Sequence, residues 1–328
     1  MTSGVPAIET FYGLIRFDES IDCTKDTLGS KADVVIGGVA GILELPSPAP
    51  WGTERPADPL NMPLTPPSGA LTWKEGGNPM FWGMPCRYPD GWSTIEKALM
   101  TFELPRDQMA VQATLVHKGF ARWHRLFQQY FELVTKQRNF SQVESEECSA
   151  RFDLFRWGSN GKADRPYDRK SPSLTIFTSD NDDLLLKPNQ FAEICALASA
   201  SKEPALHYRI QLEAYRAARS GDFRKAIIEA GTAAELGLAR AAKEMMSANG
   251  VTFVDELVKR FQALGGKLEL ARIVGVSLPD IDYKIRLVTP RNGVIHRGLF
   301  ASRETAADAI RVADELLRSI CPSLQETP

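Results

Sequence analysis

An arginine and a histidine near the C-terminal end of the sequence are the residues whose types and spacing could do chemistry. Arg291 and His296 lie in the segment TPRNGVIHRG, residues 289–298, and Asn292 directly follows the arginine. Arginine supplies a permanent cation whose planar donor fork suits a phosphate group. Histidine can give or take a proton near neutral pH. Together these side chains indicate phosphodiester chemistry.

The same segment has a purely structural interpretation. Basic residues stabilise the C-terminal end of a helix, where the helix dipole is negative, and Gly298 can terminate such a helix. Val294 and Ile295 can anchor the segment to a core. Spacing alone favours this structural interpretation, because arginine and histidine often occur close together by chance.

The elements around the motif are predicted to be helices. From about Glu203 onward the sequence has an almost entirely helical pattern. Gly221 can end one helix in the left-handed conformation, and Asp222 can cap the next. Residues 203–328 are therefore expected to form a compact helical bundle. Its predicted helices are 204–219, 222–247, 252–264, 280–296 and 302–320.

This C-terminal region resembles the HEPN superfamily, named for "higher eukaryotes and prokaryotes nucleotide-binding". The resemblance rests on AYRAARSGDFRKAIIEAGTAAELGLARAAKEMM, on RLVTPRNGVIHRG and on the final amphipathic helix. HEPN domains are small helical bundles that are often dimeric. Many are metal-independent ribonucleases with a motif of arginine, a polar residue, three to five further residues and histidine. Arg291, Asn292 and His296 match this motif, although Pro290 before the arginine could bend or restart the helix.

The resemblance implies roles for particular residues and requires neither a metal nor a cofactor. His296 would act as general base on an RNA 2′-hydroxyl or as acid on the leaving oxygen, and Arg291 would stabilise the charge of the transition state. Asn292 would orient the histidine or the phosphate. The implied RNA-backbone contacts are Lys284, Arg286 and Arg297, and the additional site candidates, which could instead be polar positions on a packed helix, are Glu229 and Glu235.

Helix geometry adds a requirement for a second copy of the chain. Residues five apart on a straight helix differ by about 140° in direction, so one Arg291 and one His296 do not converge. Two motifs packed around a two-fold axis would place both pairs in one cleft. We therefore predict a homodimer through the C-terminal bundle, and we expect the alanine-rich helix 222–247 to allow close approach.

Residues 1–202 are predicted to form a mixed α+β domain, which makes the whole chain α+β. Aromatic residues recur at helical spacing over 118–138, which predicts a helix that buries Trp123 and Phe127. The basic residues on its other face could bind a phosphate backbone, but a solvated face is the preferred interpretation. A closing helix is predicted at 191–202, and the predicted strands are 11–17, 32–45, 109–117, 151–157, 173–179 and 183–187.

Proline and tryptophan are concentrated between residues 46 and 92 of this first domain. Proline blocks long helices, so the stretch is expected to be an extended loop packed on its own domain. An enzymatic pocket in this stretch is a weaker alternative. The stretch contains no histidine, and Cys86 is its only plausible nucleophile.

Composition excludes several other classes of protein. The net charge of -2 and the pI near 6.2 create no global field that would attract nucleic acid or anionic lipid. The five cysteines are scattered without a CxxC pair, as expected of reduced thiols. The longest apolar run, residues 34–43, is too short to cross a membrane, and the N-terminus has no signal-peptide pattern. We expect a cytoplasmic protein with no membrane partner.

Two functions of different classes remain open. The first is a ribonuclease of the toxin or antiviral-defence type, restrained or directed by a protein or small-molecule trigger at the N-terminal domain. The second is a non-catalytic dimerisation or binding module with a ligand- or protein-binding N-terminal domain. An Arg291/His296 cleft open to solvent would favour the first, and burial of His296 among aliphatic side chains would favour the second.

Overall fold

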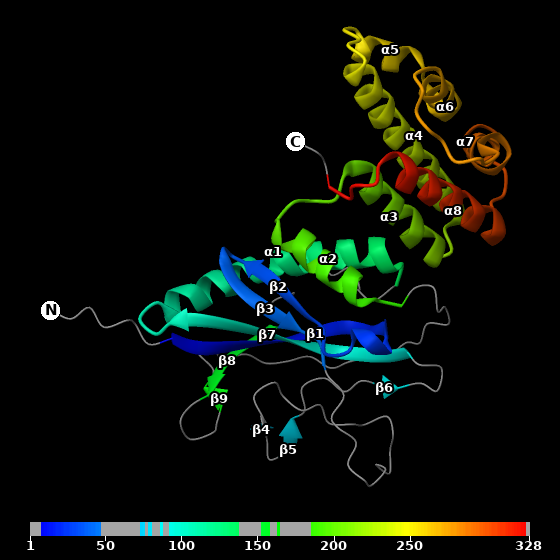
Figure 1. Cartoon of the computed structure of the whole chain (residues 1–328). Coiled ribbons are helices and arrows are strands. Elements are labelled where there is room, and N and C mark those ends of the chain that lie inside the picture. Colours follow the sequence, from blue (N-terminus) through cyan, green and yellow to red (C-terminus); the bar gives the residue numbers. More distant parts are fainter. Residues whose placement is uncertain are drawn as a thin grey trace. The chain divides into compact units, whose positions relative to one another are not determined.

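The fold is α+β and consists of two compact units. They comprise residues 1–202 and 203–328 (Figure 1). Within the described residues, the first unit contains an antiparallel sheet with two α-helices, and the second is a helical bundle. The computed structural model describes residues 8–46, 73–75, 78–80, 86–87, 92–137, 152–157, 163–164 and 185–325.

The sheet of the first unit is built on two long antiparallel strands, β1 (Ile8–Thr24) and β7 (Trp92–Pro105). The strand order is β2-β3-β7-β1-β8-β9, and β6 also pairs with β7. A separate hairpin is formed by β4 and β5. The remaining bounds are β2 Lys31–Ile36, β3 Val39–Glu44, β4 Trp73–Glu75, β5 Asn78–Met80, β6 Cys86–Arg87, β8 Phe152–Trp157, β9 Ala163–Asp164 and the 3₁₀ turn η1 Lys25–Thr27.

Helices α1 (Met109–Thr135) and α2 (Pro188–Ser199) cover one face of this sheet (Figure 1). The predicted burial of Trp123 and Phe127 is confirmed, and their rings stack with centroids 5.2 Å apart. The strand predicted for 109–117 is wrong, because these residues form the first turns of α1. Their buried positions continue the helical stripe at three- and four-residue steps, and this period outweighs the strand preference of the valines.

The β2–β3 hairpin turns at Gly37 and Gly38, whose φ angles are +60° and +83°. Glycine adopts these angles without strain. A Cβ on Gly37 would lie 2.2 Å from the carbonyl oxygen of Leu115 in α1. The prediction of strand structure over 32–45 is thus correct in type, but the segment forms two strands joined by this turn instead of one. The turn glycines also let α1 approach. The predictions for 173–179 and for most of 46–92 lie outside the described residues.

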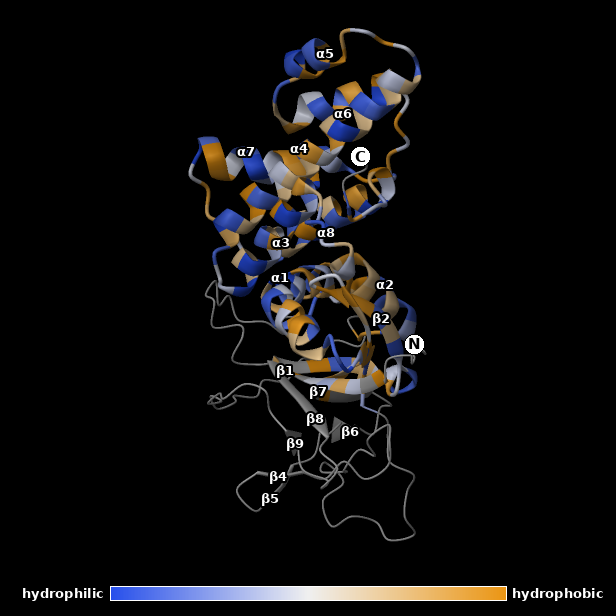
Figure 2. Cartoon of the chain, turned by 90° about the vertical axis from the view of Figure 1, so that its left-hand side faces the viewer, coloured by the Kyte–Doolittle hydropathy of each residue, from blue (hydrophilic) through white to orange (hydrophobic). Residues whose placement is uncertain are grey.

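The second unit is a bundle around the long helix α4, which contacts every other helical element of the unit (Figure 1). The core of the bundle is apolar, and hydrophilic and hydrophobic residues alternate along its helices (Figure 2). The bundle's core is rich in alanine, which keeps the helices close together. Its elements are α3 Leu206–Arg219, α4 Phe223–Ala248, α5 Val254–Arg260, α6 Ala263–Ile273, the π-helix η4 Lys284–Val288, α7 Thr289–His296 and α8 Arg303–Ile320.

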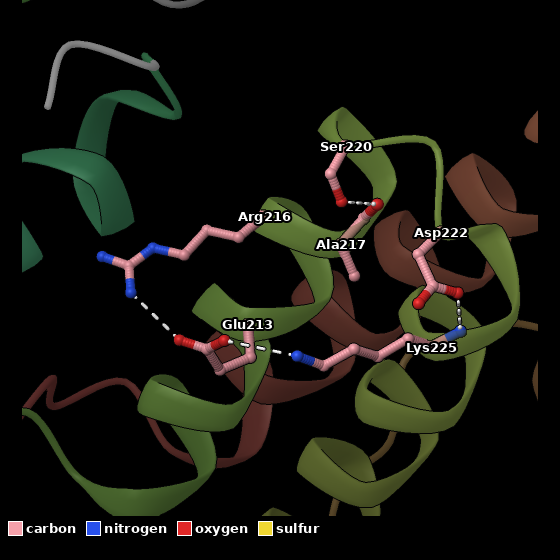
Figure 3. Close-up of polar contacts among 6 residues, drawn as sticks. All are labelled: Glu213, Arg216, Ala217, Ser220, Asp222 and Lys225. Atoms are coloured by element: carbon pink, nitrogen blue, oxygen red, sulfur yellow. Dashed lines mark hydrogen bonds and ion pairs between the residues drawn. The ribbon is translucent and has the colours of Figure 1, made fainter. Parts of the chain in front are cut away.

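The turn between α3 and α4 follows the sequence prediction. Gly221 has a φ of +83°, and the side chain of Asp222 accepts a hydrogen bond from the Lys225 backbone N–H at 2.9 Å. On α3, the Glu213 carboxylate lies between the side chains of Arg216, at 3.0 Å, and Lys225, at 3.8 Å (Figure 3). These contacts fix the start of α4, which carries part of the candidate site.

Two helix predictions in the second unit need correction. The helix predicted for 252–264 ends at Arg260, because Phe261 and Gln262 leave the helical region, and α6 then begins at Ala263. Helix α6 was not predicted, since the neighbouring Gly265 and Gly266 lower its helix propensity. The helix predicted for 280–296 comprises η4 and α7 instead of one regular α-helix.

Two further expectations concern membranes and cysteines. Within the described ranges, no helix combines the length and apolar character that a membrane crossing requires. Cys23, Cys195 and Cys321 are buried free thiols. Burial raises the pKa of the Cys321 thiol to about 11, which disfavours the thiolate.

Candidate functional site

The candidate motif lies on α7, which is joined without a break to the π-helix η4. The Thr289 backbone N–H donates to the carbonyl of Lys284, five residues back. Pro290 has no N–H to donate, and its ring would crowd the carbonyl four residues earlier in a regular α-helix. The wider π turn directly before Pro290 gives this ring room. Leu287 and Val294 are buried in the bundle core and fix the segment on both sides of Arg291.

The side chain of Arg291 packs against α4 at a site formed by Gly231 and Glu235. We call this site the arginine seat. The Arg291 Nη2 group donates to the Glu235 carboxylate at 2.9 Å. A Cβ on Gly231 would lie 2.4 Å from Arg291 Cδ, so only glycine leaves room for the arginine stem. The Arg291 side chain is 14% exposed, and its Nε atom is buried with no hydrogen-bond partner among the described residues.

A second cation lies close to the arginine seat. Lys267 of α6 is buried, and its ammonium donates to the backbone carbonyl of Val258. Burial lowers the pKa of Lys267, and the negative charge of Glu235 partly offsets this effect. Glu235 therefore interacts electrostatically with two cations, Arg291 and Lys267. The local charge around the seat is positive even though the carboxylate pairs with Arg291.

His296 is the last residue of α7, and its side chain is exposed. Backbone N–H groups of Arg297 and Leu299 both donate to the Gly293 carbonyl at 3.1 Å, and Gly298 has a φ of +61°. The segment thus ends a helix, as the structural interpretation expects. His296 itself makes no hydrogen bond to the described part of the chain, so this cap does not depend on its imidazole.

Arg291 and His296 do not meet within one chain. Arg291 is directed onto α4 through the arginine seat, and no hydrogen bond or ion pair joins it to His296 among the described residues. Asn292 is half-buried directly beyond Arg291. A site that uses both motif residues on one phosphate therefore requires a second copy of the motif or a movement of the arginine.

The other predicted site residues differ in their surroundings. Arg286 forms a bidentate pair with Asp308 of α8, with Nε–Oδ2 and Nη2–Oδ1 distances of 3.0 and 2.7 Å. Arg311 also contacts this carboxylate. Arg286 thus ties η4 to α8, whereas Lys284 and Arg297 are exposed. Glu229 is half-buried on α4 and, unlike Glu235, has no ion pair with a described residue.

Apolar side chains are exposed beside His296. Ile295, Leu299 and Phe300 form this group, which we call the α7 apolar patch, and Phe300 is 92% exposed. By contrast, most alanines of α4 are buried inside the bundle of a single chain. The alanine-rich helix therefore does not provide the close-approach surface expected for a dimer. The α7 apolar patch is the surface near the motif that a second copy could cover.

Comparison with protein-family models, with curated proteins and with solved structures found no match for this chain. Within the described residues, no group of three or more histidine, cysteine, aspartate or glutamate side chains is placed to hold a metal ion. The arrangement offers a fixed guanidinium, an exposed imidazole on the same short helix, and further cations around them.

Sequence reasoning missed two residues that position the site, Gly231 and Asp308. A glycine inside an otherwise alanine-rich helix costs helix stability, and it often marks a close approach of another group. That signal was present at Gly231 but did not name Arg291 as the approaching group. Asp308 gave no signal, because one aspartate on an amphipathic helix looks like any other solvated residue.

Proposed function

We propose that this protein is a metal-independent endoribonuclease of the HEPN type, with Arg291 and His296 in a cleft formed by two copies of the chain. The observation that carries the proposal is the contrast between the two motif residues. Arg291 is held in the arginine seat, as expected of a group that must be oriented, and His296 is exposed at the end of the same short helix. Because His296 is exposed and not packed among core side chains, its imidazole is available to a substrate, which favours the ribonuclease over the non-catalytic module.

The proposed reaction uses the nucleophile that RNA itself provides. One His296 takes the proton of a ribose 2′-hydroxyl, and the 2′-oxygen forms a bond to the adjacent phosphorus. The bond from phosphorus to the 5′-oxygen breaks, and that oxygen takes a proton from the protonated His296 of the second copy. The products are a 2′,3′-cyclic phosphate and a 5′-hydroxyl. Arg291 stabilises the additional negative charge on the phosphoryl oxygens, and Asn292 orients the histidine or the phosphate.

The surrounding charges support binding of RNA through its backbone. Lys284 and Arg297 are exposed cations that could contact phosphates independently of base sequence. Arg286 is committed to Asp308, so we assign it to the support of η4 ahead of phosphate binding. Glu235 leaves most of the five guanidinium N–H donors of Arg291 for other partners.

A specific observation also favours a second function, a non-catalytic dimerisation or binding module. Arg291 pairs with Glu235 inside one chain, and such an ion pair is sufficient to explain the arginine structurally. The α7 apolar patch would then serve association alone. The toxin or antiviral-defence role and the trigger at the N-terminal unit belong to the first proposal and rest on the HEPN resemblance.

The deciding experiment is cleavage of single-stranded RNA by the purified full chain in the presence of a chelator. We expect cyclic phosphate ends, no cleavage of DNA, and a rate for His296→Ala that is lower by about 10²–10⁴. Because the imidazole is exposed, His296→Ala should keep the unfolding midpoint of the parent protein. Gln262→Ala, also exposed on the second unit, is the matched control. Absence of cleavage by the parent chain under all conditions, or equal cleavage by His296→Ala, would favour the non-catalytic module.

A further inference from the structure

A pocket in the second unit lies between α6, the segment that leads from it to η4, and η4 itself. Its volume is about 590 Å³, within the range of about 300–1,000 Å³ that is usual for small-molecule sites. Its apolar lining comes from Leu268, which is buried, and from Ile281 and Val288, which are half-buried. These aliphatic groups offer a surface on which a flat ring could lie.

The rim of this pocket carries charged side chains of both signs. Arg272 and Lys284 are exposed, and neither forms an ion pair with any residue in the described ranges. The two rim acids differ from each other. Asp282 accepts a hydrogen bond from the Ile285 backbone N–H at 3.0 Å and so caps η4, whereas Glu269 is exposed on the same face of α6 as Arg272.

We propose that this pocket binds a single nucleotide, with the base on the aliphatic lining and its phosphate at the two rim cations. An arginine plane can stack on a nucleobase as well as donate to phosphate, and a lysine ammonium supplies a compact charge for phosphate oxygens. Two cations balanced by two acids suit a ligand with one phosphate better than a triphosphate, whose higher charge Glu269 and Asp282 would oppose.

The position of the pocket connects it to the motif. Val288 lines the pocket and lies only three residues before Arg291, a rise of about 4.5 Å along a helix. The bound nucleotide could belong to an RNA strand that crosses the Arg291/His296 cleft, or it could be free in solution. The first source rests on the proposed function, and the second does not. The chemistry of the pocket is the same for both.

Gly265 provides a direct way to fill the pocket. It lines the pocket from α6, and a Cβ placed on it would be 3.9 Å from Val288 Cγ1, an ordinary contact distance. Gly265→Phe should therefore occupy the space that the base needs without straining the α6 backbone. Gly265→Ala also raises the helix propensity but leaves the pocket open, and it is the matched control.

The test measures binding by the full chain, by calorimetry, with two probes. One probe is a mononucleotide series of AMP, CMP and UMP, with ATP for comparison, and the other is a single-stranded RNA hexamer with 2′-O-methyl groups that cannot be cleaved. We expect Gly265→Phe to abolish mononucleotide binding or to weaken hexamer binding by about tenfold or more, and Gly265→Ala to bind like the parent. Arg272→Ala and Lys284→Ala should each weaken binding by about tenfold.

The outcomes separate the two sources and separate this inference from the proposed function. Binding of mononucleotides that Gly265→Phe removes supports a site for free nucleotides, whether or not the protein cuts RNA. Binding of the hexamer alone, weakened by Gly265→Phe and unchanged by Gly265→Ala, supports a subsite for the strand. If neither probe binds, or if Gly265→Phe and the cation variants bind like the parent, the nucleotide pocket is refuted, and any RNA cleavage would remain explained by Arg291 and His296.

Discussion

Arg291 and Glu235 lie 56 positions apart in the sequence and are joined by a hydrogen-bonded ion pair of 2.9 Å between α7 and α4. Both side chains are largely buried, at 14% and 26% exposed. A pair in such surroundings is screened less by water than an exposed one. The direction of the Arg291 side chain is therefore fixed by the packing of α7 against α4.

The first prediction is that this pair contributes measurably to stability. In a double-mutant cycle of Arg291→Ala and Glu235→Ala, we expect a coupling free energy of about 1–2 kcal/mol. Urea unfolding of the second unit, followed in the full chain, measures this energy. The same cycle on Lys243 and Asp255, whose side chains are 46% and 66% exposed, serves as the control and should give a much smaller coupling free energy. A coupling free energy of zero between residues 235 and 291 would contradict the claim that the arginine seat positions Arg291.

The second prediction concerns Gly231. Gly231→Ala should gain helix propensity of about 0.5–1 kcal/mol but force the Arg291 stem out of its place. Unfolding should therefore change little, while the coupling between residues 235 and 291 should fall close to zero and RNA cleavage should drop with it. Gly265→Ala adds the same methyl group where there is room, so both properties should stay unchanged. An intact coupling in Gly231→Ala would contradict the steric argument.

The third prediction is a dimer that depends on the α7 apolar patch. Burial of one Phe300 ring contributes about 1.5–3 kcal/mol, and a two-fold interface would bury two. Sedimentation velocity at micromolar concentration should show a dimer for the parent chain and a monomer for Phe300→Ser. Phe253→Ser removes another strongly exposed ring, far from α7 in the sequence, and should leave the dimer intact. A monomeric parent chain would contradict the proposal that two copies of the chain form one cleft.

The fourth prediction is a pH dependence in the first unit. Asp22 of β1 is buried, and burial raises the pKa of its carboxyl from 3.8 to about 6. Between these values the folded state holds a proton that the unfolded state has released, so the contribution of Asp22 to stability falls as pH rises from about 4 to about 6 and is constant above. Asp22→Asn cannot titrate. Relative to the parent, it should become progressively more stable across this window, as urea unfolding at several pH values would reveal.

Local signals were sufficient for much of the fold. The period of the aromatic residues in α1, the Gly221 and Asp222 pair before α4, and the Ser302 cap of α8 each depend on residues a few positions apart. The start of α1 was misassigned because β-branched and helical signals compete over 109–117. The break between α5 and α6 was missed because the non-helical backbone at Phe261 and Gln262 leaves no distinctive pattern in their side chains.

The candidate site shows the same division between local and long-range information. The motif residues were found from their own spacing and from the resemblance it supports. Their partners come from distant segments: Glu235 reaches Arg291 from α4, and Asp308 reaches Arg286 from α8. Such contacts depend on how the helices pack, which no short sequence pattern encodes. Arg286 was accordingly assigned to RNA contact when the fold uses it to hold two elements together.

The π turn at η4 followed by Pro290 has a mechanical consequence. Prolines and π turns are both features at which helices bend, and here they occupy adjacent positions. The joint between η4 and α7 is therefore the most compliant point of that segment, with the nucleotide pocket against one side and Arg291 on the other. Any strain that reaches this segment will be relieved by hinge bending at the joint before it distorts either flanking helix.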